Sequence, residues 1–306
     1  MNQSLVYSLV FVACASTTAN KTTTAGSAPI EADSCAGDPW LKEILGERPE
    51  LSSTMVLDRM KRTRLFGPLF ANRDTLAMDH LGDLQGMRAA MAETYEWQGP
   101  PRASSSTGHE TSRVTVLRKA FGDPLALRSG DQPLYGAPST LASGAMEYPP
   151  TKTNADAPFG PNGGRVIFTF ADGTWVEVDQ WMAQRFRASF ASTGAPPLPP
   201  FGSDVAWEVC GKLDANEAVK SGAWGTVPER GVLRFYAGRD ADVDLLFRFS
   251  SLEVATRASS EQRARCAQGL PHEADKGIFS FTPPCEGAPG IEGSFLRYSM
   301  RISSVR

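Results

Sequence analysis

The segment from Arg165 to Val178 constrains the fold more than any other part of the chain. Two runs rich in β-branched and aromatic residues flank Asp172-Gly173, a pattern typical of a β-hairpin with a tight turn. A two-residue loop would place Phe170 opposite Trp175. The other face would then carry Ile167, Val176 and Val178. Because both faces would be apolar, we expect the hairpin to be covered on both sides.

Residues 165–306 as a whole predict an α+β sheet part. Further strands are expected at 205–213, 232–237, 243–249, 278–281 and 294–305. The last run alternates apolar with polar residues, which is typical of a sheet with one solvent-facing side. In the run from Val243, Leu245 would face the core, and Asp242 and Asp244 would face solvent. The predicted fold class is therefore α+β with a mostly antiparallel sheet.

Helices are predicted between these strands from their capping residues. Asp179 is a candidate N-cap for a helix in which Phe186 and Phe190 lie on one face. Ser259 and Gln262 form a capping-box pattern, which predicts the start of a second, short helix.

The N-terminal part of the body, residues 37–98, is predicted to be helical. A first helix from Asp38 has proline at its first turn and ends at Gly46. A second is expected near Ser53 and a third from about Asp74. The third would place on one stripe Ala77, His80, Leu81, Leu84, Met87 and Met91. Residues 99–164 are rich in proline, glycine and serine and predict an irregular region.

The first 14 residues predict a leader for export. Its apolar run is too short to span a bilayer but has signal-peptide length. Phe11-Val12-Ala13-Cys14 resembles the lipobox of bacterial lipoproteins, although leucine is usual at the position of Phe11. The resemblance implies cleavage before Cys14 and acylation of its thiol; cleavage after Ala15, with no lipid, is the alternative. Residues 15–36 are polar and small, as expected of a disordered tether.

The cysteines are expected to form disulfides in an exported chain. There are 5 in all, and four remain beyond Cys14. The favoured pair is Cys266 with Cys285, because the intervening stretch can turn the chain back. Cys35 would then pair with Cys210. The chain has no C-x-x-C and no histidine at ligand spacing, so we expect neither a metal site nor a cofactor.

Few residues indicate catalysis. His80 lies on the apolar stripe of the third predicted helix, whereas His109 and His272 are candidates for a hydrolase site with a carboxylate. The chain lacks the motifs G-x-S-x-G, S-x-x-K, H-E-x-x-H, the P-loop and G-x-G-x-x-G. The acidic run from Asp240 to Asp244 fails as a calcium loop, because Leu245 stands where glycine is required.

Two further groups could contact partners. Basic residues gather at Arg59, Lys61, Arg62, Arg64 and Arg73, and aromatic residues at Trp97, Trp207 and Trp224 could line a sugar site if exposed. We interpret the first group as a solvated face and the second as core. The formal net charge of −3 does not favour nucleic-acid binding.

Together these features predict an extracytoplasmic, lipid-anchored or secreted envelope protein. The body is expected to be a non-enzymatic binding or structural module for an envelope polymer or protein. The alternative is a secreted hydrolase using His109 or His272 with a carboxylate. The lipid on Cys14 would attach the chain to a membrane.

Overall fold

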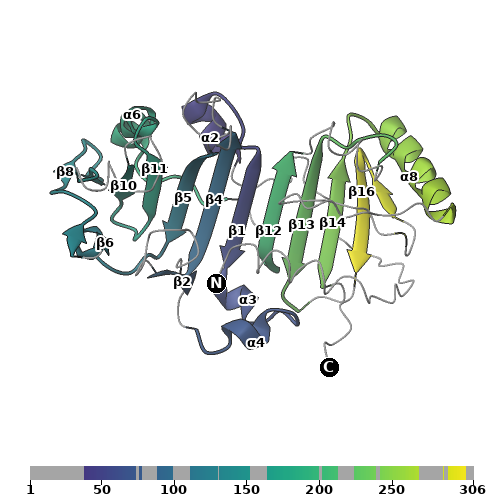
Figure 1. Cartoon of the computed structure of the whole chain (residues 1–306), viewed down its shortest axis with the longest axis horizontal. Helices are drawn as coiled ribbons and strands as arrows, with labels where there is room; N and C mark the ends of the chain where they lie inside the picture. The colour runs from purple at the N-terminus through teal and green to yellow at the C-terminus, as the bar shows by residue number, and fades with distance from the viewer. Residues whose placement is uncertain are drawn as a thin grey trace. The chain divides into compact units, whose positions relative to one another are not determined.

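Antiparallel sheet dominates both units of the computed structural model, so the α+β class is confirmed (Figure 1). The N-terminal unit comprises Ala36–Asp58 and Asn72–Phe201, and the described residues of the C-terminal unit fall in Arg59–Ala71 and Gly202–Arg306. The structure describes residues 38–73, 76–77, 88–98, 111–129, 131–151, 164–199, 202–212, 224–238, 242–268, 285 and 289–300.

The sheet of the N-terminal unit has the strand order β1, β4, β5, β11, β10, β9, β8. These strands are β1 (Leu51–Val56), β4 (Met91–Gln98), β5 (Thr111–Arg118), β8 (Ser139–Thr140), β9 (Met146–Tyr148), β10 (Arg165–Thr169) and β11 (Trp175–Asp179). Two small ladders pair β2 (Leu76–Ala77) with β3 (Arg88–Ala89) and β6 (Arg128–Ser129) with β7 (Gln132–Pro133). The short η2 (Pro124–Ala126) precedes β6.

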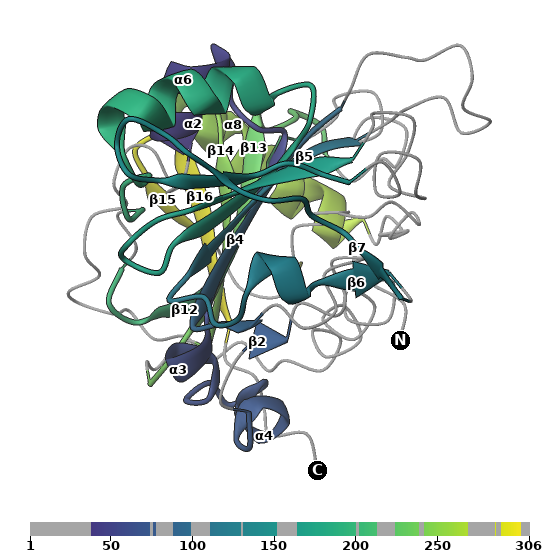
Figure 2. The same ribbon diagram turned by 90° about the vertical axis from the view of Figure 1, so that its left-hand side faces the viewer.

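Two helices cover one face of this sheet, α2 (Asp38–Leu45) and α6 (Ala183–Thr193). Figure 2 shows both on the same side of the strands. Trp40 of α2 and Phe186 of α6 meet edge to face at 6.0 Å, and Trp40 also contacts Tyr95 of β4. The aromatic residues of both helices therefore form one core with the inward residues of the strands.

The predicted hairpin is confirmed as β10 and β11, and β11 is buried on both faces. Its register differs from the prediction by one position, because Thr169 rather than Phe170 lies opposite Trp175. The loop holds an extra residue, and Gly173 adopts a left-handed φ of 81° that permits it. Since one step of register reverses the faces, Phe170 packs with the helix-side core and Trp175 lies on the opposite face.

The expectation of a helical part over residues 37–98 was wrong, because beyond α2 the described residues of this part hold only two four-residue helices, Leu57–Met60 and Gly67–Phe70. Ser53 and Met55 lie in β1, and Met91 begins β4. The alternating pattern of these strands was hidden because β1 directs Ser52 and Thr54 inward and β4 directs Glu93 inward, all buried. Polar residues at inward positions remove the two-residue apolar period by which a strand is recognised. The region from 78 to 87, with His80, lies outside the described residues.

The C-terminal unit has the strand order β12, β13, β14, β16, β15. Its elements are β12 (Val205–Lys212), β13 (Arg230–Tyr236), β14 (Val243–Arg248), β15 (Gly290–Glu292), β16 (Phe295–Met300), α4 (Gly67–Phe70) and α8 (Leu252–Ala267), and α3 (Leu57–Met60) lies where the chain first passes between the units. One face of the sheet packs against α8 (Figure 1). The strands expected at 205–213, 232–237 and 243–249 are confirmed, whereas 278–281 lies outside the described residues.

The segment Arg59–Ala71 is held in this unit by the aromatic ring of Phe66 and by arginine side chains. Phe66 packs edge to face on Trp207 at 5.4 Å and on Phe235 at 5.0 Å. Arg59 donates a hydrogen bond to the carbonyl oxygen of Val205 at 2.9 Å. Part of the basic group recognised in the sequence therefore holds the chain in place.

Both predicted helix starts near the sheets need correction. Asp179 does not cap α6, because it ends β11 and its carboxylate accepts a hydrogen bond from the backbone N–H of Arg113. The helix expected from Ser259 begins earlier, where the side chain of Ser251 caps α8 by accepting from Val254 N–H. Ser259 lies within α8 on its buried face. Polar residues chosen as caps thus serve packing and ion pairing instead.

The core of the N-terminal unit yields a first prediction. Phe186→Ala is expected to lower the free energy of unfolding by about 3–5 kcal/mol, because the phenyl ring is fully buried between two other aromatic rings. The matched control is Phe121→Ala, since Phe121 is 56% exposed and its loss should change stability by less than about 0.5 kcal/mol. Denaturant unfolding of the full chain measures both. Equal costs for the two variants would contradict this assignment of the core.

Candidate functional site

The structure confirms some of the site residues predicted from the sequence, and others lie outside the described residues. The Cys266–Cys285 disulfide is confirmed, with 5.4 Å between the Cα atoms. Cys210 is also disulfide-bonded, but Cys35 lies outside the described residues, so their pairing stays a prediction. Also outside the described residues are Cys14, His80, His109 and His272.

The aromatic and acidic candidates are buried. Trp97, Trp207 and Trp224 all lie in the core, which agrees with the interpretation that they pack and do not line a sugar site. Asp242 and Asp244 were expected to face solvent, and this was wrong, because both are buried. Asp242 instead pairs with Arg64 at 3.5 Å.

Arg118 centres a polar cluster next to the core of the N-terminal unit. Its Nε lies 2.8 Å from Glu93 Oε1, and the Tyr95 hydroxyl donates to Glu93 Oε2 at 2.8 Å. The two terminal nitrogens of the guanidinium donate to the carbonyl oxygens of Pro196 and Pro197. Burial raises the pKa of Glu93, and the charge of Arg118 opposes that rise. Both carboxylate oxygens and all three guanidinium nitrogens thus have partners.

A second cluster lies on the opposite face of the same sheet. Arg165 is placed between two carboxylates of β11, 3.1 Å from Glu177 and 3.3 Å from Asp179. The Tyr135 hydroxyl donates to the other oxygen of Glu177 at 3.1 Å. Burial raises the pKa of Asp179, and Arg165 and the N–H of Arg113 counteract it. This cluster ties the segment around β7 to the sheet.

The C-terminal unit has a comparable centre at Asp244, which is 0% exposed. Its carboxylate accepts hydrogen bonds from three side chains on neighbouring strands, Tyr236 at 2.8 Å, Ser299 at 2.6 Å and Arg297 at 2.5 Å. Arg297 and Ser299 occupy the polar positions of β16 that the alternating sequence pattern placed in solvent. Their partner is a buried carboxylate, so this face is an ion-paired layer.

These clusters link neighbouring strands through their side chains. A general acid or base needs a proton position within reach of a substrate, and the carboxylates of Glu93, Glu177 and Asp244 already accept from neighbouring donors. Within the described ranges, no group of histidine, cysteine, aspartate and glutamate could hold a metal ion. In that same part of the chain, no helix is long and apolar enough to cross a membrane.

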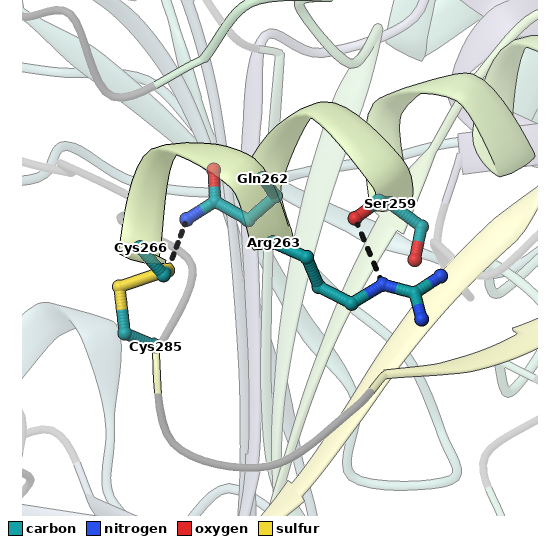
Figure 3. The surroundings of a disulfide bond; sticks show 5 residues. All are labelled: Ser259, Gln262, Arg263, Cys266 and Cys285. Carbon is teal, nitrogen blue, oxygen red and sulfur yellow. Dashed lines mark hydrogen bonds between the residues drawn. A yellow bond between two sulfur atoms is a disulfide. The ribbon is translucent and has the colours of Figure 1, made fainter. Parts of the chain in front are cut away.

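A different arrangement surrounds the confirmed disulfide at the end of α8 (Figure 3). Gln262 Nε2 lies 3.5 Å from Cys266 Sγ, and Arg263 Nε donates to the carbonyl oxygen of Ser259. Figure 3 shows Gln262 beside the sulfur of Cys266, whereas Arg263 extends away from the disulfide toward Ser259. Cys285 is exposed and Cys266 is half-buried, so solvent reaches the bond.

Three buried oxygen atoms near this helix have no hydrogen-bond partner among the described residues. They belong to Ser259, Gln262 and Tyr298, the last on the β16 face that packs against α8. Burial raises the pKa of Tyr298 to about 12, although the charge of Arg263 lowers it. A buried polar group without a partner costs free energy, so such groups mark weak docking or a functional role. We take the disulfide, Gln262 and this polar contact layer as the candidate functional site.

Sequence reasoning predicted the two cysteines of this site but missed its polar layer. Gln262 and Ser259 were interpreted as a helix start, because their spacing matches a capping box. A signal was nevertheless present. The buried positions of α8, Ala255, Ala258, Ser259 and Gln262, follow helical spacing with small or polar residues in place of large apolar ones.

No protein-family model matches the chain, and neither does a curated protein or a solved structure.

The Arg118 cluster generates a second prediction. Arg118→Leu is expected to lower the free energy of unfolding by about 3–5 kcal/mol, because it leaves the buried Glu93 carboxylate without its cation. Glu93→Leu should also destabilise the chain. The double variant should cost less than the sum of the two single variants, which a denaturant double-mutant cycle measures. Strictly additive costs would show that the two side chains are not coupled.

Two tyrosines provide a third, matched prediction. Tyr298→Phe should leave the free energy of unfolding unchanged or raise it by up to about 1 kcal/mol at neutral pH, because its hydroxyl has no described partner. Tyr236→Phe should lower it by about 1–3 kcal/mol, because Asp244 loses a donor.

The Tyr298→Phe variant also has a defined pH dependence. The pKa of Tyr298 is about 12 in the folded chain and about 10 in an unfolded one. Above the unfolded value the unfolded chain loses this proton first, so the stability that Tyr298 contributes falls as pH rises from about 10 to 12. Tyr298→Phe should flatten that part of the unfolding curve. An alkaline decline identical in the wild-type chain and in this variant would refute the assignment.

Proposed function

We propose that the chain is an exported, lipid-anchored envelope protein with a non-catalytic body. The observation that carries the proposal is the bonded state of its cysteines: Cys266 with Cys285, and Cys210 as well. Disulfides of this kind persist in oxidising compartments and are rare in the cytosol. The leader predicted over residues 1–14 supplies a route to such a compartment.

The cysteine count connects acylation of Cys14 with the pairing of Cys210. Because Cys266 and Cys285 bond to each other, the only candidates for the partner of Cys210 are Cys14 and Cys35. An acylated Cys14 has a thioether sulfur and cannot form a disulfide. A lipid-anchored chain therefore requires Cys35 with Cys210, which fastens the end of the predicted tether to β12. Residues 15–34 would then separate the membrane from the body.

The body suits binding or support better than catalysis. Its ion-paired clusters use the charged groups of both sheets to hold strands together, as at Asp244 and Arg118. Faces held rigid by such ion pairs favour recognition of another surface. An envelope protein or polymer is the proposed partner, and the net charge of −3 does not favour nucleic acid.

Intact mass of the native protein tests the anchor and the disulfides together. We expect the membrane-associated chain to begin at Cys14 with added acyl mass, and to gain two hydrogens for each disulfide on reduction. Cys14→Ala should release the chain from membranes. The matched control, Cys35→Ala, should stay membrane-bound and leave Cys210 without its proposed partner.

Each result separates the parts of this proposal. Unacylated protein cleaved after Ala15 would contradict the lipid anchor but would leave export and the disulfides unaffected. A Cys14–Cys210 disulfide would overturn both the anchor and the tether geometry. Native protein recovered from the cytosol with Met1 present and its thiols free would overturn the whole proposal.

A further inference from the structure

The Cys266–Cys285 bond differs from Cys210 in its access to solvent. Cys285 is exposed and Cys266 is half-buried, whereas Cys210 is only 2% exposed and packs with Val232 and Leu246. Thiol–disulfide exchange requires a thiolate to reach a sulfur atom. The bond at the end of α8 is therefore open to attack while Cys210 is shielded by the sheet.

Because α8 packs weakly on the sheet, the disulfide at its end matters for holding the helix in place. The helix buries Ala255 and Ala258 on its inner face, and alanine removes little apolar area from water. Two further inner positions, Ser259 and Gln262, each bury an oxygen with no described partner. These polar groups weaken the docking. A side-chain hydrogen bond from Thr226 to Glu261 at 2.8 Å links the middle of the helix to the loop before β13.

We propose that Cys266–Cys285 is a thiol-exchange site that controls how firmly α8 is held on the sheet of the C-terminal unit. The oxidised bond secures the C-terminal end of the helix, and its reduction by an external dithiol loosens that end. The inference concerns this unit alone and does not depend on the lipid anchor.

The exchange begins at the more exposed sulfur. A thiolate of the reductant attacks Cys285 Sγ, a new S–S bond forms, and the Cys266–Cys285 bond breaks with Cys266 leaving as a thiolate that takes a proton from water. The second thiolate of the reductant then attacks the reductant's sulfur in the mixed disulfide. This closes a disulfide within the reductant and releases Cys285 as a thiolate, which takes a proton from water. The dithiol ends as a disulfide, and the protein gains two electrons and two protons.

Gln262 is a positioning residue for this step. Its Nε2 lies 3.5 Å from Cys266 Sγ and donates toward the sulfur that leaves. The C-terminal end of a helix disfavours a thiolate, because the helix dipole is negative there. A donor at this position offsets that effect, and departure is faster from a better stabilised sulfur.

The first test compares the oxidised and mildly reduced full chain, using dithiothreitol and alkylation under native conditions. Cys266 and Cys285 should be alkylated while Cys210 stays protected. Hydrogen exchange in the last two turns of α8 should then become about tenfold faster or more, and exchange in β13 should not change. Unchanged exchange in α8 would overturn the proposal. Equal acceleration in β13, or alkylation of Cys210 at the same rate, would also overturn it.

The second test addresses Gln262 through the rate constant of dithiothreitol reduction. Gln262→Ala should slow that reduction roughly two- to fivefold, the effect of one net hydrogen bond on the leaving sulfur. The matched control is Gln268→Ala, an exposed glutamine at the end of the same helix, which should leave the rate unchanged. If the disulfide of the Gln262→Ala variant is reduced faster than that of the wild-type chain, the glutamine acts only by packing and its positioning role is wrong.

Discussion

The guanidinium of Arg118 ties together three stretches of the N-terminal unit, β4, β5 and the chain that follows α6. It pairs with Glu93 of β4 from its own place on β5, and it binds the carbonyl oxygens of the chain that leaves α6. Arg118 and Glu93 are both buried, where an unpaired charge is costly. The position of α6 over the core is therefore coupled to one ion pair, and the aromatic packing of Phe186 and Phe190 depends on it.

In the C-terminal unit the central buried group is an acid, Asp244, instead of an arginine. Asp244 collects donors from β13 and β16, so strands held by backbone bonds are also linked through side chains. Large apolar side chains then concentrate on the opposite face, under α8. Buried charged groups link neighbouring strands in both units, whereas apolar packing supplies most of the stabilisation.

The sequence predicted those parts in which local pattern and final environment agree. The hairpin at Asp172-Gly173, the strands predicted at 205–213, 232–237 and 243–249 and the Cys266–Cys285 pair were found because each has a local signature. The strands β1 and β4 were missed, since their inward polar residues become compatible with burial only when Arg118 arrives from β5. The candidate site was half predicted for the same reason. The cysteines have a signature, whereas the burial of Ser259 depends on where β16 lies.

The pairing of β5 with β11 also sets the order of events during folding. Val116 lies beside Val176, about sixty residues further along the chain, whereas β4 and β5 are near neighbours in the sequence. Contacts of such long range close slowly, because the loop entropy is lost before the contact repays it. Until β11 arrives, the paired strands β4 and β5 would expose unpaired strand edges to other chains. Assembly of the N-terminal unit should thus be limited by the arrival of β11, and a chaperone that shields β5 until then would raise the yield.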